Sequence, residues 1–211
     1  MSEQTVPLIH IVSDDSALCG SLQRLLQSVG LQVTIFTDAE ALLTAYQPDQ
    51  AGCLVLGVRS GLDSLRIQHS LREQGVELPI IIIAGNSEVP VAVAAMKQGA
   101  TDFIEKPFNE QMLLDCVHNA LSQDAVRQRI RRQQQEVLWR YQALTLREQA
   151  VLKQVAEGLS NREIAEALDL SRKTVEVHRA KVMQKMQAET LSQLIRMAMT
   201  LGILKTYDLE G

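Results

Sequence analysis

The feature that most restricts the fold of this chain is an alternation of short apolar runs with amphipathic stretches across residues 1–123. The runs are continuously apolar, which is typical of parallel strands covered on both faces. The expected strands are Leu8–Val12, Val33–Phe36, Cys53–Leu56, Ile80–Ala84 and Asp102–Glu105. The helices that follow them are expected at Ser16–Val29, Ala39–Tyr46, Leu62–Gln74, Val89–Gln98 and Asn109–Leu121. Five such units predict an α/β fold with a doubly wound five-stranded parallel sheet, whose functional sites lie at the carboxyl ends of the strands.

From Leu144 onward the chain contains only helical patterns, and the starts of the helices are well marked. The spacing S/T-x-x-E/Q occurs three times, and each occurrence is expected to be a capping box: Thr145–Glu148, Ser160–Glu163 and Thr190–Gln193. Gly158 and Gly202 occupy positions typical of glycines that end helices. The four expected helices are Leu146–Glu157, Asn161–Leu168, Arg172–Met186 and Leu191–Leu201. Because only three residues separate the second helix from the third, an all-α domain with a helix-turn-helix is predicted.

Residues 124–143 connect these two parts and contain neither proline nor glycine, so we expect a helical linker. Its apolar residues recur at intervals of three, four and seven, which fits either a short coiled-coil seam or a face that packs on the neighbouring domain. This stripe consists of Val126, Ile130, Val137, Tyr141 and Leu144. The predicted domains are therefore residues 1–123 and 144–211, joined by the linker 124–143.

Charge is divided unevenly between the two parts. Residues 1–123 carry six Lys/Arg and 14 Asp/Glu, whereas residues 124–211 carry 15 and 11. This division indicates that only the second part binds a polyanion, although two solvated surfaces that differ by chance would look the same.

Three scattered cysteines without a CxxC pair, no apolar run of membrane length and no signal-peptide pattern predict a cytoplasmic protein without a membrane partner. Since no metal cluster, nucleophile–base pair or phosphate-binding loop is present, we expect no metal, no cofactor and no enzyme activity.

Two segments of the chain resemble known families. The run GLSNREIA at Gly158–Ala165, with SRKTVEVHR at Ser171–Arg179, resembles a LuxR-type helix-turn-helix. Ile9–Val12 followed by Asp14, together with VPVAVAAMKQGATDFIEKPF at Val89–Phe108, resembles the receiver domain of response regulators, most closely the FixJ group of FixJ/NarL-type regulators. The resemblance implies a flavodoxin-like receiver joined to a DNA-binding domain in a transcription regulator, normally activated by phosphorylation of a receiver aspartate.

The resemblance also implies a phosphorylation pocket, but this sequence lacks most of its groups. In receivers a carboxylate ends the third strand, acidic residues after the first strand hold Mg²⁺, and a hydroxyl and a lysine complete the cradle. Gly57 stands at the carboxylate position, Ser13 at the first acidic position and Ala84 at the hydroxyl position. The retained residues are Asp14, Asp15, Phe103, Lys106 and Pro107, of which the last two are expected to share a cis bond. We therefore expect a receiver that is not phosphorylated, for which a sensor kinase is a doubtful partner.

Several expectations follow for this degenerate pocket. Lys106, without a carboxylate at position 57, is expected to pair with Asp14 and to plug the pocket, although a pocket that binds a small effector is an alternative. Phe103 is expected to turn inward beside Ala84, with the face of residues 89–98 and 102–105 ready to dimerise. Two other functions stay open: a phosphorylation-dependent regulator that uses Asp15 or Asp63, and an interaction protein that titrates intact receivers.

The helix Arg172–Met186 carries the candidate DNA-reading residues. One face is expected to pack inward, with His178 as a packed residue and not a metal ligand; it comprises Val175, His178, Val182, Met183 and Met186. The opposite face offers groups that can contact base edges: Lys173, Glu176, Val177, Ala180 and Lys181. Phosphate contacts are expected from Ser160, Asn161, Arg162, Arg172, Thr174, Arg179 and Lys185. The apolar last helix predicts a homodimer on an inverted repeat of double-stranded DNA, acting with the transcription machinery.

Overall fold

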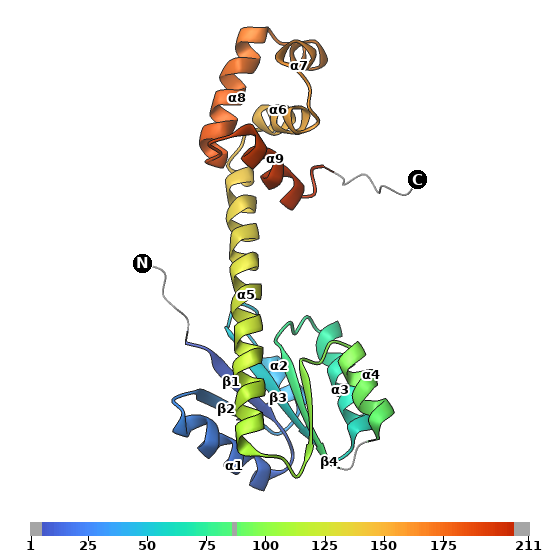
Figure 1. The fold of residues 1–211 in the computed structure, drawn as a ribbon. Coiled ribbons are helices and arrows are strands. Elements are labelled where there is room, and N and C mark those ends of the chain that lie inside the picture. Colours follow the sequence, from blue (N-terminus) through green and yellow to red (C-terminus); the bar gives the residue numbers. More distant parts are fainter. Residues whose placement is uncertain (1–5, 86–87, 205–211) are drawn as a thin grey trace. The chain divides into compact units, whose positions relative to one another are not determined.

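The computed structural model describes residues 6–85 and 88–204 (Figure 1). The chain divides into two compact units, residues 1–128 and 129–211, and each is described by itself. Residues 205–211, which end the predicted second domain, lie outside the described range.

The first unit is a five-stranded parallel sheet with the strand order β2-β1-β3-β4-β5. Its strands are β1 (Leu8–Val12), β2 (Gln32–Phe36), β3 (Gly52–Val58), β4 (Ile80–Gly85) and β5 (Asp102–Lys106). The helices are α1 (Ser16–Ser28), α2 (Ala39–Ala45), α3 (Gly61–Glu73), α4 (Val89–Lys97) and the first part of α5 (Glu110–Gln142). The predicted doubly wound α/β fold is confirmed, and every strand lies within two residues of its predicted bounds.

Two apolar layers, one on each face of the sheet, form the core of this unit. Ile9, Ile11 and Val55 pack with side chains of α1 and α5. Leu54 and Leu56 point to the other face and pack with side chains of α2, α3 and α4. Because both faces are covered, nearly all positions of the central strands β1, β3 and β4 are buried, which explains why these strands are continuously apolar in the sequence.

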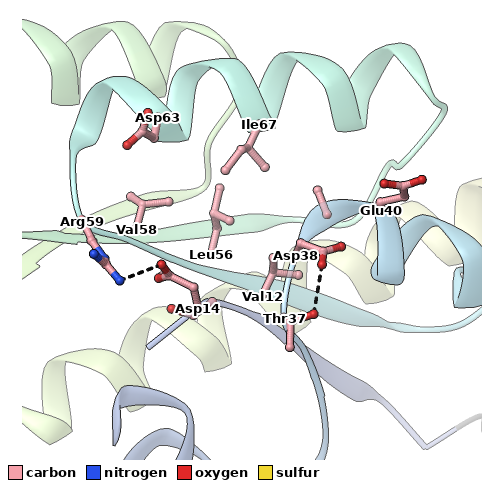
Figure 2. A pocket seen from close by; sticks show the side chains of 13 residues that line it. Val12, Asp14, Thr37, Asp38, Glu40, Leu56, Val58, Arg59, Asp63 and Ile67 are labelled. Carbon is pink, nitrogen blue, oxygen red and sulfur yellow. Dashed lines mark hydrogen bonds and ion pairs between the residues drawn. The ribbon is translucent and has the colours of Figure 1, made fainter. Parts of the chain in front are cut away.

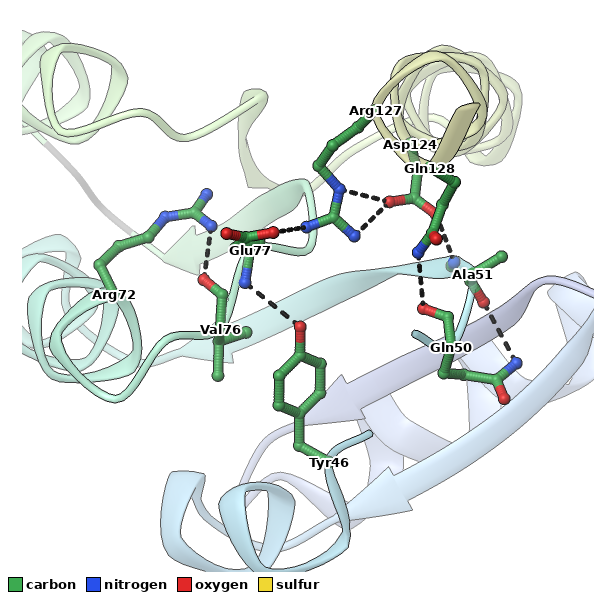
Figure 3. A network of polar contacts seen from close by, with 10 residues as sticks. Tyr46, Gln50, Ala51, Arg72, Val76, Glu77, Asp124, Arg127 and Gln128 are labelled. Carbon is green, nitrogen blue, oxygen red and sulfur yellow. Dashed lines mark hydrogen bonds and ion pairs between the residues drawn. The ribbon is translucent and has the colours of Figure 1, made fainter. Parts of the chain in front are cut away.

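Helix α5 runs without a break from Glu110 to Gln142, so the predicted last receiver helix and the predicted linker are one element. The helical turn of α5 that follows residue 123 belongs to the first unit. Asp124 is 1% exposed, and its carboxylate accepts hydrogen bonds from the Gly52 amide at 2.8 Å and from Arg127 Nε at 3.0 Å (Figure 3). The side chain of Gln128 donates to the Gln50 carbonyl at 3.4 Å. These contacts attach this helical turn to the start of β3, and the first compact unit accordingly extends to Gln128.

The second unit contains the end of α5 with α6 (Leu146–Ala156), α7 (Asn161–Leu168), α8 (Arg172–Met186) and α9 (Leu191–Thr200). Capping boxes begin α6 and α7 as predicted. At α9 only half of the box forms: the Gln193 amide donates to Thr190 Oγ1, but the Gln193 side chain accepts from the Glu189 amide. The helical half of the predicted architecture is thus confirmed, with one cap that differs in detail.

The apolar stripe of α5 behaves differently along its length. Val137 and Tyr141 pack against the core of the second unit, which supports the packing alternative for this part. Val126 and Ile130 are exposed on the same helix, and a coiled-coil contact there stays a prediction. Trp139, the only tryptophan of the chain, is 77% exposed on α5. Within residues 6–85 and 88–204, none of the helices has both the length and the apolar character of a membrane span.

Candidate functional site

The turn between α7 and α8 has the geometry of a helix-turn-helix. Asp169 ends α7 in the left-handed conformation with φ of 52°, which aspartate tolerates better than most residues. Two residues later Ser171 caps α8, where its side chain accepts a hydrogen bond from the Thr174 amide at 3.1 Å. The chain therefore leaves one helix and starts the next within three residues, as the sequence predicted.

The face of α8 that is turned away from the core carries an exposed row of mixed character. Its residues follow intervals of three and four, so they share one side of the helix: Lys173, Glu176, Val177, Ala180 and Lys181 are all exposed. Val177 is 49% exposed although it is apolar. Arg172 at the start of α8, and Ser160 and Arg162 at the start of α7, are also exposed. The structure thus brings these sequence-predicted residues to the surface of the helix-turn-helix.

Several of the candidate phosphate contacts are engaged within the domain. Arg179 Nη1 donates to Asn161 Oδ1 at 2.8 Å, which links α8 to the first turn of α7. The Thr174 hydroxyl lies 2.8 Å from the Ser171 hydroxyl. These residues are half-buried or close to the caps, so they hold the two helices together and leave only part of their polar surface for a ligand.

Lys185, another candidate phosphate contact, pairs with a buried acid of α6. Its Nζ is 2.6 Å from Oε2 of Glu148, the buried acid of the α6 capping box, and 3.3 Å from the Ala143 carbonyl. Burial alone would raise the pKa of Glu148, but hydrogen bonds from Lys185 and from the Thr145 amide outweigh it, so this pKa lies below its usual value. In this structure Lys185 thus stabilises the start of α6, and its predicted contact with phosphates stays a prediction.

The inward face of α8 follows the prediction in most positions. Val175, Val182 and Met186 are buried in the core of the second unit, whereas His178 and Met183 are half-buried. Among the described residues the Nδ1 atom of His178 has no hydrogen-bond partner. A packed histidine, as predicted, fits this placement.

In the first unit Lys106 pairs with Asp15 and not with Asp14. The distance from Lys106 Nζ to Asp15 Oδ2 is 3.3 Å, so the predicted pair with Asp14 is wrong. Asp15 caps α1 by accepting from the Leu18 amide at 3.0 Å, and this bond, followed by the one from Lys106, lowers its pKa. Asp14 instead forms an exposed ion pair with Arg59 at 3.0 Å. The cap fixes the carboxylate of Asp15 toward Lys106, whereas Asp14 faces the loop after β3.

The position of the missing phosphoacceptor is filled by neighbouring side chains. A Cβ atom at Gly57 would lie 2.7 Å from Leu18 Cδ2 and 2.9 Å from Ser13 Oγ. The groups present also do not fit the Mg²⁺ of receivers, because Gly57 and Ser13 offer no carboxylate while Asp14 and Asp15 both pair with cations. No group of three or more metal-binding side chains occurs within the described residues.

The other residues of the degenerate pocket are arranged around β4 and β5. Ala84 is fully buried, and the Lys106–Pro107 bond is cis as the resemblance implied. Phe103 is half-buried against the core layer with α4, and it also lines a surface groove with Val93 and Met96. The inward turn of the Phe103 ring and the dimerisation expected of this face both stay predictions.

Sequence reasoning missed a cavity of about 470 Å³ that opens between α2 and α3 (Figure 2). Of the lining residues, the sequence prediction had placed only Ser13, Asp14 and Gly57 in a pocket. The other polar lining residues are Thr37, Asp38, Glu40, Arg59 and Asp63. Most of these follow the carboxyl ends of β2 and β3, and this position was the available signal, because parallel strands bring such residues to one edge.

Comparisons with known proteins agree with both units. Residues 9–118 match the family described as "Response regulator receiver domain", and residues 142–198 match "Bacterial regulatory proteins, luxR family". Nodulation protein W of Bradyrhizobium diazoefficiens is 43% identical over 200 residues, which cover 94% of this chain and 88% of that protein. Transcriptional regulatory protein FixJ of the same organism is 42% identical over 197 residues, which cover 93% and 96%.

Solved structures give the same assignment. The response regulator StyR matches with a TM-score of 0.79 at 36% identity, over 92% of this chain and 98% of that one. Full-length FixJ from B. japonicum matches with a TM-score of 0.53 at 39% identity, over 96% of this chain and 100% of that one. The chain therefore belongs to the response-regulator transcription factors that carry a receiver domain and a LuxR-type DNA-binding domain.

Proposed function

We propose that the protein is a sequence-specific regulator of transcription in the cytoplasm, whose second unit binds double-stranded DNA and whose receiver works without phosphorylation. The observation that carries the first part is the exposed row on α8 next to the tight turn after α7. A helix that presents such a row fits the major groove of DNA, whose base edges carry a distinct pattern of donors and acceptors.

The residues of this surface divide into two proposed roles. Lys173 can donate to guanine, Glu176 can accept from cytosine and Val177 can contact a thymine methyl, while Ala180 lets the backbone approach the groove and Lys181 adds a further donor. Contacts to the DNA backbone are proposed for Ser160, Asn161, Arg162, Arg172, Thr174 and Arg179. Arg179 would then both hold α7 through Asn161 and face a phosphate, which would fix the position of α8 on the duplex.

The protein is proposed to act as a homodimer on an inverted repeat. Leu191 and Met199 are exposed on α9 although both are apolar, which supports a contact between two copies of this helix. Two recognition helices related by twofold symmetry read two half-sites of opposite orientation. From such a site the dimer would act on the transcription machinery.

The filled space at Gly57 supports control without phosphate. Glycine has no side chain that can carry a phosphoryl group, and Leu18 and Ser13 occupy the space where a carboxylate would stand. The geometry disfavours Asp15 as a substitute acceptor, because one of its carboxylate oxygens accepts from the Leu18 amide of α1 and the other from Lys106. Full-length protein treated with acetyl phosphate should carry no acid-labile phosphate; incorporation at Asp15 or Asp63 would contradict this part of the proposal.

Binding to a promoter pool by fluorescence anisotropy tests the DNA-binding part. We expect tight binding that weakens steeply with salt, because phosphate contacts release counterions. Lys173→Ala should weaken it, whereas the matched control Lys153→Ala, at an exposed position of α6, should not. Equal behaviour of the two variants, or binding that does not respond to salt, would contradict the proposal.

A second function, the titration of intact receivers, is favoured by one observation. Val89, Val93 and Met96 are exposed on α4, with Val89 at 76%, and they form an apolar face beside β5. Such a face supports association with another receiver, including one of a different regulator. Capture of an intact receiver by the full-length protein, lost in Val93→Glu, is the expected result.

A further inference from the structure

The cavity between α2 and α3 has the size and the walls of a small-molecule site. Its volume of about 470 Å³ falls within the range of roughly 300–1,000 Å³ that is usual for ligand pockets. The apolar part of its wall consists of Val12, Ala39, Leu56, Val58 and Ile67. It lies at the carboxyl ends of β1 and β3, where the strand order reverses and where doubly wound sheets commonly bind ligands.

This cavity borders the position of the missing phosphoacceptor, since Ser13, Asp14 and Gly57 are among its lining residues, and it extends from there between α2 and α3. A side chain at Gly57 would point toward Leu18 of α1, into space that is already filled. The neighbouring residues Leu56 and Val58 point to the opposite face of the sheet and form part of the cavity wall. A molecule in the cavity would therefore contact the face covered by α2 and α3 and would also lie beside Gly57.

The charges around the cavity select the kind of ligand. Figure 2 shows Asp63 and Glu40 on opposite sides of the apolar side chains Leu56 and Ile67. Both carboxylates are exposed, and neither has a cationic partner within the part of the chain that the structure describes. A cationic group entering the cavity would be attracted from either side, and an anionic group would be repelled.

The two remaining acidic residues of the lining, Asp38 and Asp14, already have partners within the protein. Their negative charges still contribute to the electrostatic field of the cavity. Asp38 accepts hydrogen bonds from the Ala41 amide at 2.8 Å and from the Thr37 hydroxyl at 3.0 Å, which lower its pKa and keep it ionised. Asp14 is balanced by Arg59, the positively charged residue among those that line the cavity. The lining as a whole is therefore acidic, with its single cation neutralised.

We propose that this cavity binds a small organic amine, whose apolar body packs between α2 and α3 and whose ammonium group faces Glu40 or Asp63. That such an amine takes the place of phosphate as the input signal rests on the function proposed above. The binding itself does not depend on the DNA-binding unit.

The test compares three probes of similar shape that differ in charge. Phenethylamine, phenethyl alcohol and hydrocinnamate are titrated into the full-length protein, and binding is followed by amide chemical shifts. The amine is expected to bind about tenfold or more tightly than the carboxylate, with the alcohol between them, and to shift residues that line the cavity. No binding of the amine, or equal affinity for all three probes, would overturn the proposal.

Matched variants separate the cavity from the surrounding surface. Ala39→Phe should fill the cavity and abolish binding, whereas Ala45→Phe, at an exposed position of the same helix, should leave it unchanged. Glu40→Gln combined with Asp63→Asn should remove the preference for the amine, whereas Glu73→Gln on α3 should not. Amide spectra establish that each variant is folded, and binding that survives Ala39→Phe in a folded protein overturns the site.

DNA binding of the same preparations is measured without any probe. If phenethylamine does not bind while DNA binding is intact, the inference fails and the proposed function stands. If the protein does not bind DNA while the amine binds as described, the inference about the cavity stands and the proposed function is contradicted.

Discussion

His10 is a buried histidine in the middle of β1. It is 5% exposed, its ring centroid lies 5.8 Å from that of Phe36, and within the described residues neither ring nitrogen has a partner. Burial lowers the pKa of His10 from its ordinary value of 6.5, because a charged ring would lose its water. The folded protein thus keeps this ring neutral in a pH range where the unfolded chain protonates it.

The stability of the first unit should therefore fall as the pH drops below 6.5, by at most about 1.4 kcal/mol per pH unit from this group. His10→Leu is expected to reduce that slope, since the side chain at position 10 then no longer gains a proton on unfolding. Urea unfolding at pH 7.5 and 5.5 measures it, with His118→Leu on the exposed side of α5 as the control. An unchanged slope in His10→Leu would show that another group causes the loss.

The side chains around Gly57 leave no room for a side chain at this position. Gly57→Ala would bring a methyl group to 2.7 Å from Leu18 Cδ2 and should destabilise the unit by about 1–3 kcal/mol, as overpacking of a core does. In a Leu18→Ala background the same change should cost clearly less, because the obstructing side chain is gone. The four unfolding free energies form a double-mutant cycle. A coupling near zero would mean that Leu18 does not fill this position.

At the scale of an element, the buried carboxylate of Asp124 joins α5 to the start of β3. Asp124 accepts from the Gly52 amide, and a Cβ atom at Gly52 would lie only 1.9 Å from the Leu8 carbonyl oxygen, so a glycine is needed where the strands meet the helix. Arg127 completes the cluster by bridging Asp124 and Glu77 (Figure 3). A residue that receives both a backbone and a guanidinium hydrogen bond away from water contributes strongly to the attachment of the helix.

Asp124→Ala should destabilise the first unit by about 3–5 kcal/mol, because it leaves the Gly52 amide and Arg127 without their acceptor. It should also speed hydrogen exchange at the Gly52 amide. Asp115→Ala, at an exposed position of the same helix, is the control and should cost little. Equal effects of the two changes would contradict the anchoring role of Asp124.

Elements with local signals could be predicted from the sequence, and contacts between distant residues could not. The bounds of α7 and α8 match the prediction to the residue, since Ser160 and Ser171 cap them through neighbouring amides. The pairing of Lys106 with Asp15 spans 91 positions and depends on how the α1 cap turns one of two adjacent aspartates. The ion pair of Lys185 with Glu148 and the cavity between α2 and α3 likewise depend on tertiary placement, which periodicity does not encode.

For the whole molecule, sequence specificity and overall affinity for DNA are expected to respond to different mutations. Glu176→Ala should relax the preference at one base pair, a contact worth about 1–3 kcal/mol, while affinity for other sequences changes little. Arg172→Ala should weaken all sequences alike and flatten the salt dependence, since a phosphate contact carries no base information. Binding to a randomised duplex library measures both. An unchanged preference in Glu176→Ala would remove this residue from the reading face.

Trp139 has a consequence for how the molecule can be observed. An indole that contacts water in the folded chain emits much as it does after unfolding, so tryptophan fluorescence should report little about the melting of either unit. The same exposure makes its emission sensitive to anything that covers this part of α5, because removal from water shifts indole fluorescence to shorter wavelengths. The only tryptophan of the chain is therefore an optical reporter of association at α5, while unfolding has to be followed by circular dichroism or by the amide signals.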